Sequence, residues 1–349
     1  MMDSFNKREM NNAKKNKRIA WLDFVKLMAI YLVLYGHSLQ YLKTDIDPHY
    51  NYMWLFIYSF HMPLFMLISG YFSYGIINDK FLTLIKKKTI QFIVPCLIWG
   101  GIWYILKIVF VYNDVSDVKI NVIQDLKWLT MDVLWFLKSL FLCIVLCYIF
   151  KKNIWFLLLS ILLSQIMPFK LPLMYPCFLF GFFCREKNVF DKINVKWTVV
   201  NVLLFAVLYY FFKPQHMLTN LRATAIGTLS GDYLPFLMEC KNRIYCLLIG
   251  IIGSLAFISV CKAFNSLVEK SYLGDGFSKF GSQTQAVYIL HGPIMAYGLA
   301  TLINLNSMNI NIFNIVVCPV ISFALLVLCL YLINSIPPKA RKILFGSEN

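Results

Sequence analysis

Three residues that could carry chemistry lie within one apolar run, Arg18–Leu42: Asp23, Lys26 and His37. Lys26 lies three residues after Asp23, and His37 eleven residues after Lys26, or about three turns of an α-helix. In a helix over residues 19–42 the three side chains would therefore share one stripe. An imidazole is suited to accept a proton near neutral pH, and a buried cation to stabilise developing negative charge. Because a charge inside a membrane helix costs a few kcal/mol, we predict that this stripe is catalytic.

A simpler interpretation of these residues needs no catalysis. Asp23 and Lys26 would pair at the inner membrane interface, with the lysine stem in the bilayer and its ammonium in water. His37 would then be a packed histidine with one hydrogen bond. The shared stripe favours the catalytic interpretation.

Two more histidines lie beside helix-breaking residues inside apolar runs. His61 belongs to YSFHMPLFMLISGYF, and His291 belongs to KFGSQTQAVYILHGPI. The prolines that follow them remove a backbone hydrogen bond and permit kinks. We expect a helical hairpin to bring His37 and His61 to a common cavity, and we assign His291 to it as well. The alternative is that His61 and His291 are structural histidines packed beside a kink.

Ser69 and a set of lysines complete the candidate residues. Ser69 is followed by glycine, a pair that lets another helix or a ligand approach closely, and we assign Ser69 to the cavity. Lys138 lies just inside the apolar run LWFLKSLF, where it either extends to the outer surface or faces the cavity. Four further lysines form the densest basic segment on an inner loop outside the N-terminal tail: Lys80, Lys86, Lys87 and Lys88. They either anchor that loop at the membrane or attract the phosphates of an anionic donor.

The composition indicates the elements that must position these residues. Hydrophobic residues make up 59% of the 349 residues and charged residues only 14%, whereas a soluble domain has about 25% charged residues. We therefore predict an all-α, polytopic integral membrane bundle with about ten transmembrane helices. The expected spans are residues 19–42, 53–77, 89–112, 134–150, 154–168, 171–185, 197–212, 243–264, 285–303 and 311–336. Prolines 168, 172 and 176 are expected to kink or break the spans around them.

The distribution of basic residues predicts the orientation. With a cytoplasmic N-terminus, inner segments hold 22 of the 33 lysines and arginines, as the positive-inside rule requires. This explains the net charge of +16 without a nucleic-acid partner. We expect a basic cytoplasmic tail over residues 1–18 without a cleavable signal peptide, a transmembrane domain over 19–336 and a cytoplasmic tail over 337–349. Residues 113–133 and 213–242 are expected to be outer segments, and the latter is long enough either to cover a cavity or to be a plain loop.

The ten cysteines do not indicate a metal site or a disulfide framework. Cys143 and Cys147 are four residues apart, but no histidine or second cysteine pair lies near them in the sequence. We interpret them as small buried apolar residues and expect no bound metal.

The motifs together resemble membrane-bound acyltransferase family 3. The resemblance rests on LDFVKLMAIYLVLYGH, FHMPLFMLISGYF, WFLKSLF and FGSQTQAVYILHGPI, which occur in this order over almost the whole chain. It is strongest to the branch of fucose-4-O-acetylase-like and of exopolysaccharide and capsule O-acetyltransferases. The family's essential histidine corresponds to His37. Its intramembrane basic residue corresponds to Lys26, where many members have arginine.

The resemblance implies an O-acetyltransferase in a bacterial cell membrane. Its donor would be cytoplasmic acyl-CoA, most simply acetyl-CoA, and its acceptor a hydroxyl of a cell-surface or lipid-linked carbohydrate. No bound cofactor is implied, and proteins of polysaccharide synthesis are expected partners. Both direct transfer and a transient acyl-histidine are compatible with this chemistry.

A transporter or flippase for a polar lipid or sugar is the alternative function. Intramembrane charges and broken helices serve transport equally well. We find no internal repeat of the kind many transporters carry, and no Gly-x-Ser-x-Gly, Gly-x-Gly-x-x-Gly or P-loop motif of soluble enzymes. Movement of a substrate in proteoliposomes without an acyl donor would identify a transporter.

Overall fold

The computed structural model describes residues 20–75, 80–111, 115–151, 153–217, 233–268 and 279–347, and within these ranges every regular element is helical. The all-α class is therefore confirmed. The α-helices are α2 (Ala20–Tyr41), α3 (Tyr52–Tyr58), α4 (His61–Ser73), α5 (Phe81–Lys88), α6 (Val94–Phe110), α7 (Val115–Met131), α8 (Trp135–Phe150), α9 (Ile154–Ser164), α10 (Leu171–Glu186), α11 (Val195–Tyr210), α13 (Leu234–Val268), α15 (Thr284–Pro293), α16 (Ala300–Leu302), α17 (Ile310–Ile312), α18 (Cys318–Ser335) and α19 (Pro338–Phe345). Short 3₁₀ and π turns, labelled η, join some of them.

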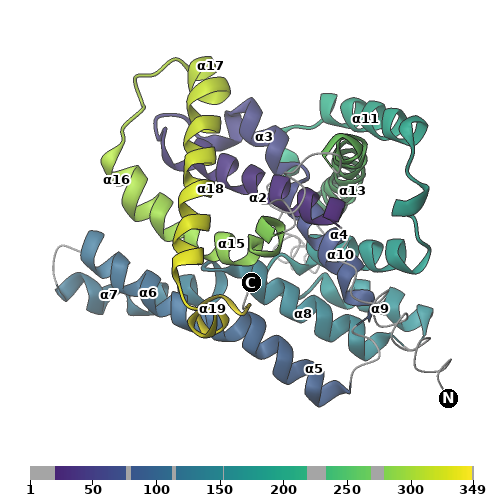
Figure 1. The fold of residues 1–349 in the computed structure, drawn as a ribbon, viewed down its shortest axis with the longest axis horizontal. Helices are drawn as coiled ribbons and strands as arrows, with labels where there is room; N and C mark the ends of the chain where they lie inside the picture. The colour runs from purple at the N-terminus through teal and green to yellow at the C-terminus, as the bar shows by residue number, and fades with distance from the viewer. Residues whose placement is uncertain are drawn as a thin grey trace.

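Helix α2 crosses the middle of the molecule between α13 and α18 (Figure 1). It also packs against α3, α4 and α15. Of its most apolar stretch 67% is buried, against 22% for the apolar helix over Phe81–Phe110. The polar residues of α2 are thus surrounded mainly by other helices.

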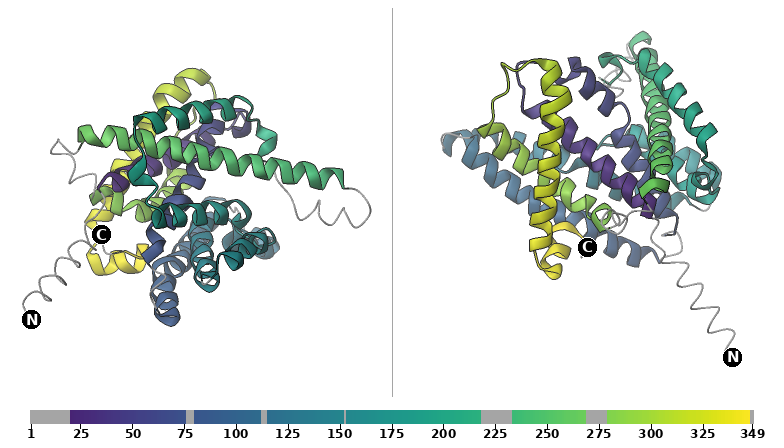
Figure 2. Two further views of the ribbon diagram at one scale, coloured as in Figure 1. Left: turned by 90° about the vertical axis from the view of Figure 1, so that its right-hand side faces the viewer. Right: turned by 45° about the horizontal axis from the view of Figure 1, so that its top comes forward.

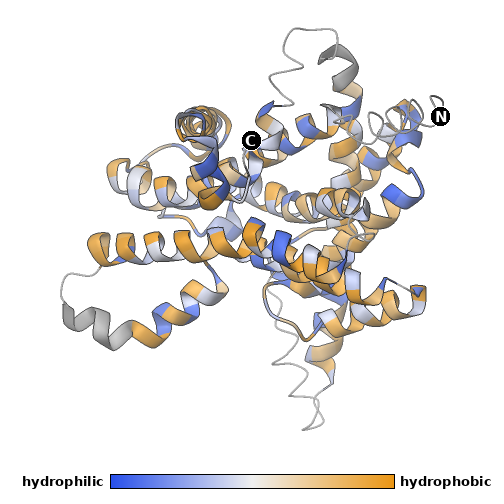
Figure 3. Ribbon diagram, turned by 60° about the horizontal axis from the view of Figure 1, so that its bottom comes forward, coloured by the Kyte–Doolittle hydropathy of each residue, from blue (hydrophilic) through white to orange (hydrophobic). Residues whose placement is uncertain are grey.

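Long α13 runs beside α11 along one side of the molecule (Figure 2). Hydrophobic residues, drawn in orange, make up much of most helices (Figure 3). Large side chains such as Leu97, Leu203 and Tyr331 are 61–71% exposed. Exposed apolar surface of this extent is what contact with lipid requires.

Five helical stretches within the described residues are long and apolar enough to cross a membrane: Trp21–Tyr41, Tyr52–Ser73, Phe81–Phe110, Leu234–Phe264 and Ile310–Ser335. The pair Val122–Met131 and Trp135–Phe150, bent by 54°, adds a sixth if it is taken as one span. The remaining predicted spans coincide with shorter helices. The chain is therefore a multi-pass membrane protein, and the count of ten spans stays a prediction.

Prolines interrupt the helices near the places that the sequence indicated. The helical path breaks at Ser59 and Phe60 between α3 and α4, just before Pro63. At Pro293 the chain stays helical, but the α-helix changes there to the π turn η7 (Ile294–Leu299). Two other π turns, η3 (Thr89–Ile93) and η8 (Phe313–Val317), directly precede helices that begin with a proline at the second position. Because proline cannot donate its backbone hydrogen bond, the neighbouring turn widens to adapt.

Helices α4 and α10 pack with their backbones in close contact through two glycines. A β-carbon on Gly70 would lie 1.9 Å from the carbonyl oxygen of Phe178, and one on Gly181 would lie 1.8 Å from that of Leu67. The close approach expected at Ser69-Gly70 is thus made by another helix, as is common in membrane proteins.

The structure shows helices in three segments that were expected as loops or tails, and their sides of the membrane stay predictions. Residues 115–131, predicted to belong to an outer loop, form helix α7. Helix α13 already begins at Leu234, inside the outer segment expected over residues 213–242, and residues 218–232 lie outside the described part. The C-terminal segment forms helix α19. One face of this helix is apolar, and its Phe345 is buried against Trp99. The tail over residues 1–18 lies outside the described residues.

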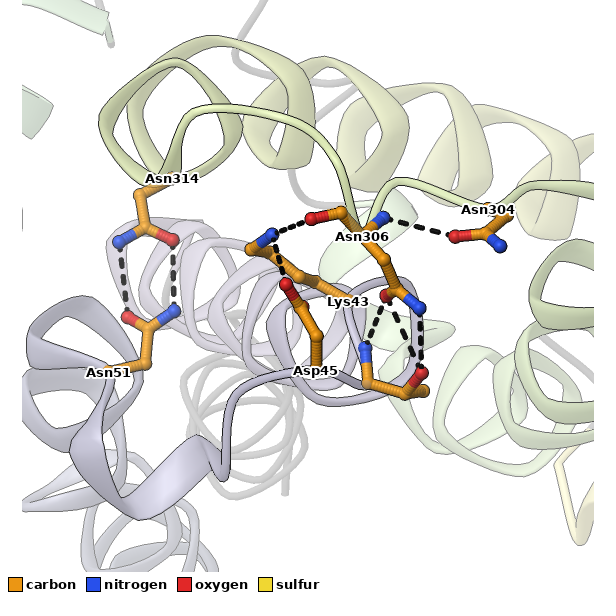
Figure 4. A network of polar contacts seen from close by, with 7 residues as sticks. Lys43, Asp45, Asn51, Asn304, Asn306 and Asn314 are labelled. Carbon is orange, nitrogen blue, oxygen red and sulfur yellow. Dashed lines mark hydrogen bonds and ion pairs between the residues drawn. The ribbon is translucent and has the colours of Figure 1, made fainter.

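A polar network joins the segment after α2 to the segment around α17 (Figure 4). The side-chain amides of Asn51 and Asn314 exchange two hydrogen bonds of 2.9 and 3.1 Å, and both residues are buried. Lys43 donates to Asp45 and to the backbone carbonyl of Asn306. Asn51 also caps α3 by accepting from two backbone N–H groups. The network therefore fixes where α3 begins, and α3 contributes to the site described below.

Candidate active site

A cavity of about 1000 Å³ contains all three predicted intramembrane histidines, and we call it the histidine cavity. His37 comes from α2, His61 from α4 and His291 from α15. The ring centres of His37 and His291 are 5.1 Å apart. The expected meeting of these histidines at one cavity is what the structure shows, while their catalytic roles stay predictions.

Hydrogen bonds distinguish the three imidazoles. The Nδ1 of His61 lies 2.9 Å from the carbonyl oxygen of Ile57, and that of His291 lies 3.1 Å from the carbonyl oxygen of Val287. Since a carbonyl only accepts, each Nδ1 carries the hydrogen and each Nε2 keeps its lone pair in the neutral ring. The Nδ1 of His37 is buried and has no hydrogen-bond partner within the described part of the chain. His37 instead has a side-chain hydrogen bond with Gln40, and because an amide can donate or accept, this bond does not fix the tautomer of His37.

Aromatic rings hold His37 in place. Its ring stacks on Tyr41 at 5.7 Å, and the edge of Tyr58 approaches it at 6.4 Å. Tyr58 also contacts His61, at 4.4 Å. Gly36 makes this possible, because a β-carbon there would lie 2.7 Å from the Tyr58 ring.

The rest of the wall of the histidine cavity combines aromatic and polar side chains from several helices. Four tryptophans contribute, together with two glutamines and several charged residues. They are Trp54, Trp103, Trp128, Trp135, Gln40, Gln165, Asp132, Lys170 and Arg243. A mainly apolar wall with a few polar groups is typical of a site for an organic ligand.

A second cavity, of about 290 Å³, contains Lys26, Lys88 and Ser69, and we call it the lysine cavity. Lys26 pairs with the buried carboxylate of Asp23 at 2.5 Å, and its ammonium lies 5.0 Å from the ring centre of Phe72. Lys88 donates to the side chain of Gln91 at 2.7 Å. Two lysine ammonium groups thus lie at this small cavity, one of them paired with a carboxylate.

The cavity wall is tied to the C-terminal helix. The side-chain amide of Gln285 donates to the backbone carbonyls of Gln91 and Phe345, both at 2.8 Å. Gln91 and Gln285 line the lysine cavity. The end of α19 thus supports this cavity from outside.

The two cavities adjoin. Val33, Met62 and Tyr288 line both of them. Lys26 and His37 consequently lie in different cavities, roughly 16 Å apart along the axis of α2. The predicted stripe does lie on one helix, but its Lys26 end lines the lysine cavity and its His37 end lines the histidine cavity.

Some predicted site residues do not line either cavity. Lys80, Lys86 and Lys87 are exposed, whereas Lys88 is buried and lines the lysine cavity. Lys138 donates to the carbonyls of Leu129, Thr130 and Val133 at 2.7–2.9 Å and so caps the end of α7. The expectation that Lys138 faces the cavity is therefore wrong, because the three carbonyls at the bend between α7 and α8 bind its ammonium.

Several residues that line the site escaped the sequence analysis, among them Tyr288 and His49. Tyr288 lies three residues before His291, a spacing that could have indicated it. His49 lines the histidine cavity from the 3₁₀ turn η1 (Pro48–Tyr50) and pairs with Asp47 at 2.7 Å. Hydrogen bonds from the backbone and ring of His49 lower the pKa of the Asp47 carboxyl. Within the described residues no three histidine, cysteine, aspartate or glutamate side chains gather as metal ligands.

The fold and its two adjoining cavities define a multi-pass helical membrane protein with a polar site enclosed by its helices. Residues 19–334 match the model of the acyltransferase domain of acyltransferase family 3, and the chain belongs to this family. This is the family that the sequence motifs resembled, and its membership agrees with the multi-pass helical fold.

Two curated relatives carry the name nodulation protein NolL. The protein from Mesorhizobium japonicum is 32% identical over 234 residues, which cover 60% of this chain and 61% of the relative. The protein from Sinorhizobium fredii is 29% identical over 214 residues, which cover 56% of each chain. The chain thus spans about three fifths of the length of these relatives. No solved structure is significantly similar to the chain.

Proposed function

We propose that the chain is an O-acyltransferase, most simply an O-acetyltransferase, that moves an acyl group from acyl-CoA to a carbohydrate hydroxyl. The observation that carries this proposal is the contact between a small cavity with two lysines and a large cavity rich in histidine and aromatic side chains. Lysine side chains are suited to the phosphates of CoA. Aromatic rings and amides are suited to the apolar faces and hydroxyls of a sugar.

The chemistry assigned to His37 is general base catalysis. Its imidazole removes the proton of the acceptor hydroxyl while that oxygen attacks the thioester carbon. The tetrahedral intermediate collapses as the carbon–sulfur bond breaks, and the protonated imidazole returns the proton to the CoA thiolate. In the alternative mechanism, the imidazole nitrogen first attacks the thioester carbon and releases the CoA thiolate. The sugar oxygen then attacks the acyl carbon and releases the imidazole. Trapping of labelled acyl-enzyme in the absence of acceptor distinguishes the two routes.

The orientation of the chain follows from the same proposal. Residues expected at inner ends of spans, such as Lys26, Lys88 and Gln285, line the lysine cavity. Residues expected in or near outer segments, such as His49, Asp132 and Lys170, line the histidine cavity. We therefore propose ten spans with both termini cytoplasmic, in a bacterial cell membrane. Proteins of polysaccharide synthesis would supply the acceptor.

Cysteine labelling tests this orientation. Single cysteines at positions within 45–51 and 113–133 should react with a membrane-impermeant reagent in intact cells. A cysteine introduced into residues 1–18 should react only after lysis. Labelling of the N-terminal cysteine in intact cells would contradict the proposed topology.

Mass spectrometry of surface glycans tests the activity. Glycans from cells that carry the chain should show an acyl mass increment that is lost when the gene is deleted and regained when it is restored. Inverted membrane vesicles should transfer label from acetyl-CoA to endogenous glycan. Identical glycan masses with and without the chain would contradict the proposal.

A further inference from the structure

We infer that Val33, Met62 and Tyr288 select the acyl group, and that they admit a short, uncharged one. These three residues form the partition between the lysine and histidine cavities. The inference rests on the proposed function, because it concerns the acyl group of the proposed donor.

The partition residues come from the same three helices as the histidines. Within the described residues, only these three side chains line both cavities. Val33 precedes His37 by four residues on α2, and Tyr288 precedes His291 by three on α15. Residues at these spacings occupy the same face of a helix, one turn apart. Met62 directly follows His61 on α4. Each helix thus contributes one histidine and one partition residue.

This placement determines where the acyl group must lie during transfer. The CoA phosphates would lie with Lys26 and Lys88, on one side of the partition. The base, His37, lies on the other side. A thioester carbon that is attacked next to His37 while CoA occupies the lysine cavity must therefore be at the partition, where its acyl group contacts the three side chains.

The chemistry of the partition limits the acyl groups that fit. Val33 is 2% exposed, and the partition separates the lysine cavity from a space more than three times larger. The valine and methionine side chains are apolar, and the tyrosine offers one hydroxyl. No cation belongs to the partition, so the distal carboxylate of a succinyl group would be desolvated there without a partner. An acetyl or propionyl group carries no charge and adds few atoms, so it can lie among these three side chains without an unpaired carboxylate.

The experiment compares acyl donors in one membrane preparation. Cells that normally carry the chain are deleted for its gene and complemented with each variant. Inverted vesicles then receive labelled acetyl-, propionyl-, butyryl- or succinyl-CoA, and label in the endogenous glycan is measured. The wild type should prefer acetyl over butyryl by at least about tenfold, since one or two methylenes in a fitted pocket are worth roughly 10–200-fold.

Two variants change the partition in opposite directions. Met62→Ala enlarges it and should lower the acetyl-to-butyryl preference by about tenfold. Val33→Ile narrows it and should lower propionyl transfer relative to acetyl. Met66→Ala is the matched control, because Met66 is fully buried on the same helix but lines neither cavity. It should leave the preference unchanged even if less protein accumulates.

The outcomes separate the inference from the proposed function. A wild type that transfers none of the four acyl groups would overturn both. A wild type that transfers acetyl groups, with a donor preference that neither partition variant alters, would overturn the inference alone. If Met62→Ala does not accumulate in membranes, Val33→Ile decides the question by itself.

Discussion

The histidine cavity, of about 1000 Å³, and the lysine cavity, of about 290 Å³, differ in size and chemistry although α2, α4 and α15 line both. At one end these helices present Lys26, Ser69 and Gln285. At the other end they present His37, His61 and His291. Under the proposed function, this one set of helices would hold an anionic donor and a sugar acceptor in separate cavities that meet at the residues lining both.

This comparison predicts that changes in one cavity affect one substrate or one step. The largest effect is expected at His37, in the histidine cavity. Removing a general base should lower transfer by roughly 10²–10⁴-fold, so we expect this loss in His37→Ala and in His37→Gln. Labelled acyl transfer per amount of membrane-inserted protein is the measurement.

His216→Gln is the control for His37, because His216 lies outside both cavities. It should retain normal transfer. Near-normal transfer by both His37 variants would remove His37 from the mechanism, and His61 would be the next candidate for the base.

Lys26 should give the next largest effect, through the lysine cavity. A hydrogen bond to a charged group is worth about 1.5–3 kcal/mol, so Lys26→Ala should lower kcat/KM for the donor by roughly ten- to hundredfold. Lys26→Arg keeps the charge and should keep appreciable activity. A KM for the acceptor that rises as much as the donor KM in Lys26→Ala would contradict the separation of the two cavities.

A substitution at the contact of α4 and α10 should damage both cavities equally. Gly181→Ala places a β-carbon 1.8 Å from the carbonyl oxygen of Leu67, and overpacking of this kind costs roughly 1–3 kcal/mol of stability. We expect a lower melting temperature with little change in the ratio of donor to acceptor KM. Gly100→Ala is the control, since a β-carbon at Gly100 has no neighbour within 4 Å. A selective change of one KM in Gly181→Ala would show that α10 acts on one cavity only.

The smallest effects are expected on the donor KM, and their salt dependence should distinguish Lys88 from its exposed neighbours. Lys88→Ala should raise the donor KM at both low and high salt, because its ammonium is buried in the lysine cavity. The triple variant Lys80→Ala, Lys86→Ala and Lys87→Ala should raise it by about twofold, and only at low salt. An equal rise in both variants, with equal salt dependence, would mean that the whole basic group binds the donor phosphates.

Much of the site could be predicted from the sequence, because polar residues in apolar helices are conspicuous. His37, His61 and His291 lie at one cavity as expected. The break before Pro63 and the π turn after Pro293 also follow from the missing proline N–H. These features depend on local chemistry that a single helix already contains.

The division into two cavities could not be predicted in this way. It depends on Val33, Met62 and Tyr288, which come from three helices and look like ordinary core residues in the sequence. The inward position of Lys88 had a signal, since Leu84 lies four residues earlier and both are buried on one face of α5. Helix α7 was expected as a loop because its charges obscure the apolar periodicity.

The docked end of α19 has a practical consequence for experiments with fusion proteins. Truncation from Pro337 onward would remove Phe345, and with it the ring that stacks on Trp99 and one of the two backbone acceptors of Gln285. A reporter joined within α19 would then disturb the lysine cavity, and the resulting change in donor kinetics could be misread as a change in topology. A fusion should therefore begin after residue 347 and keep Gly346, since a β-carbon there would lie 2.0 Å from the carbonyl oxygen of Gln91.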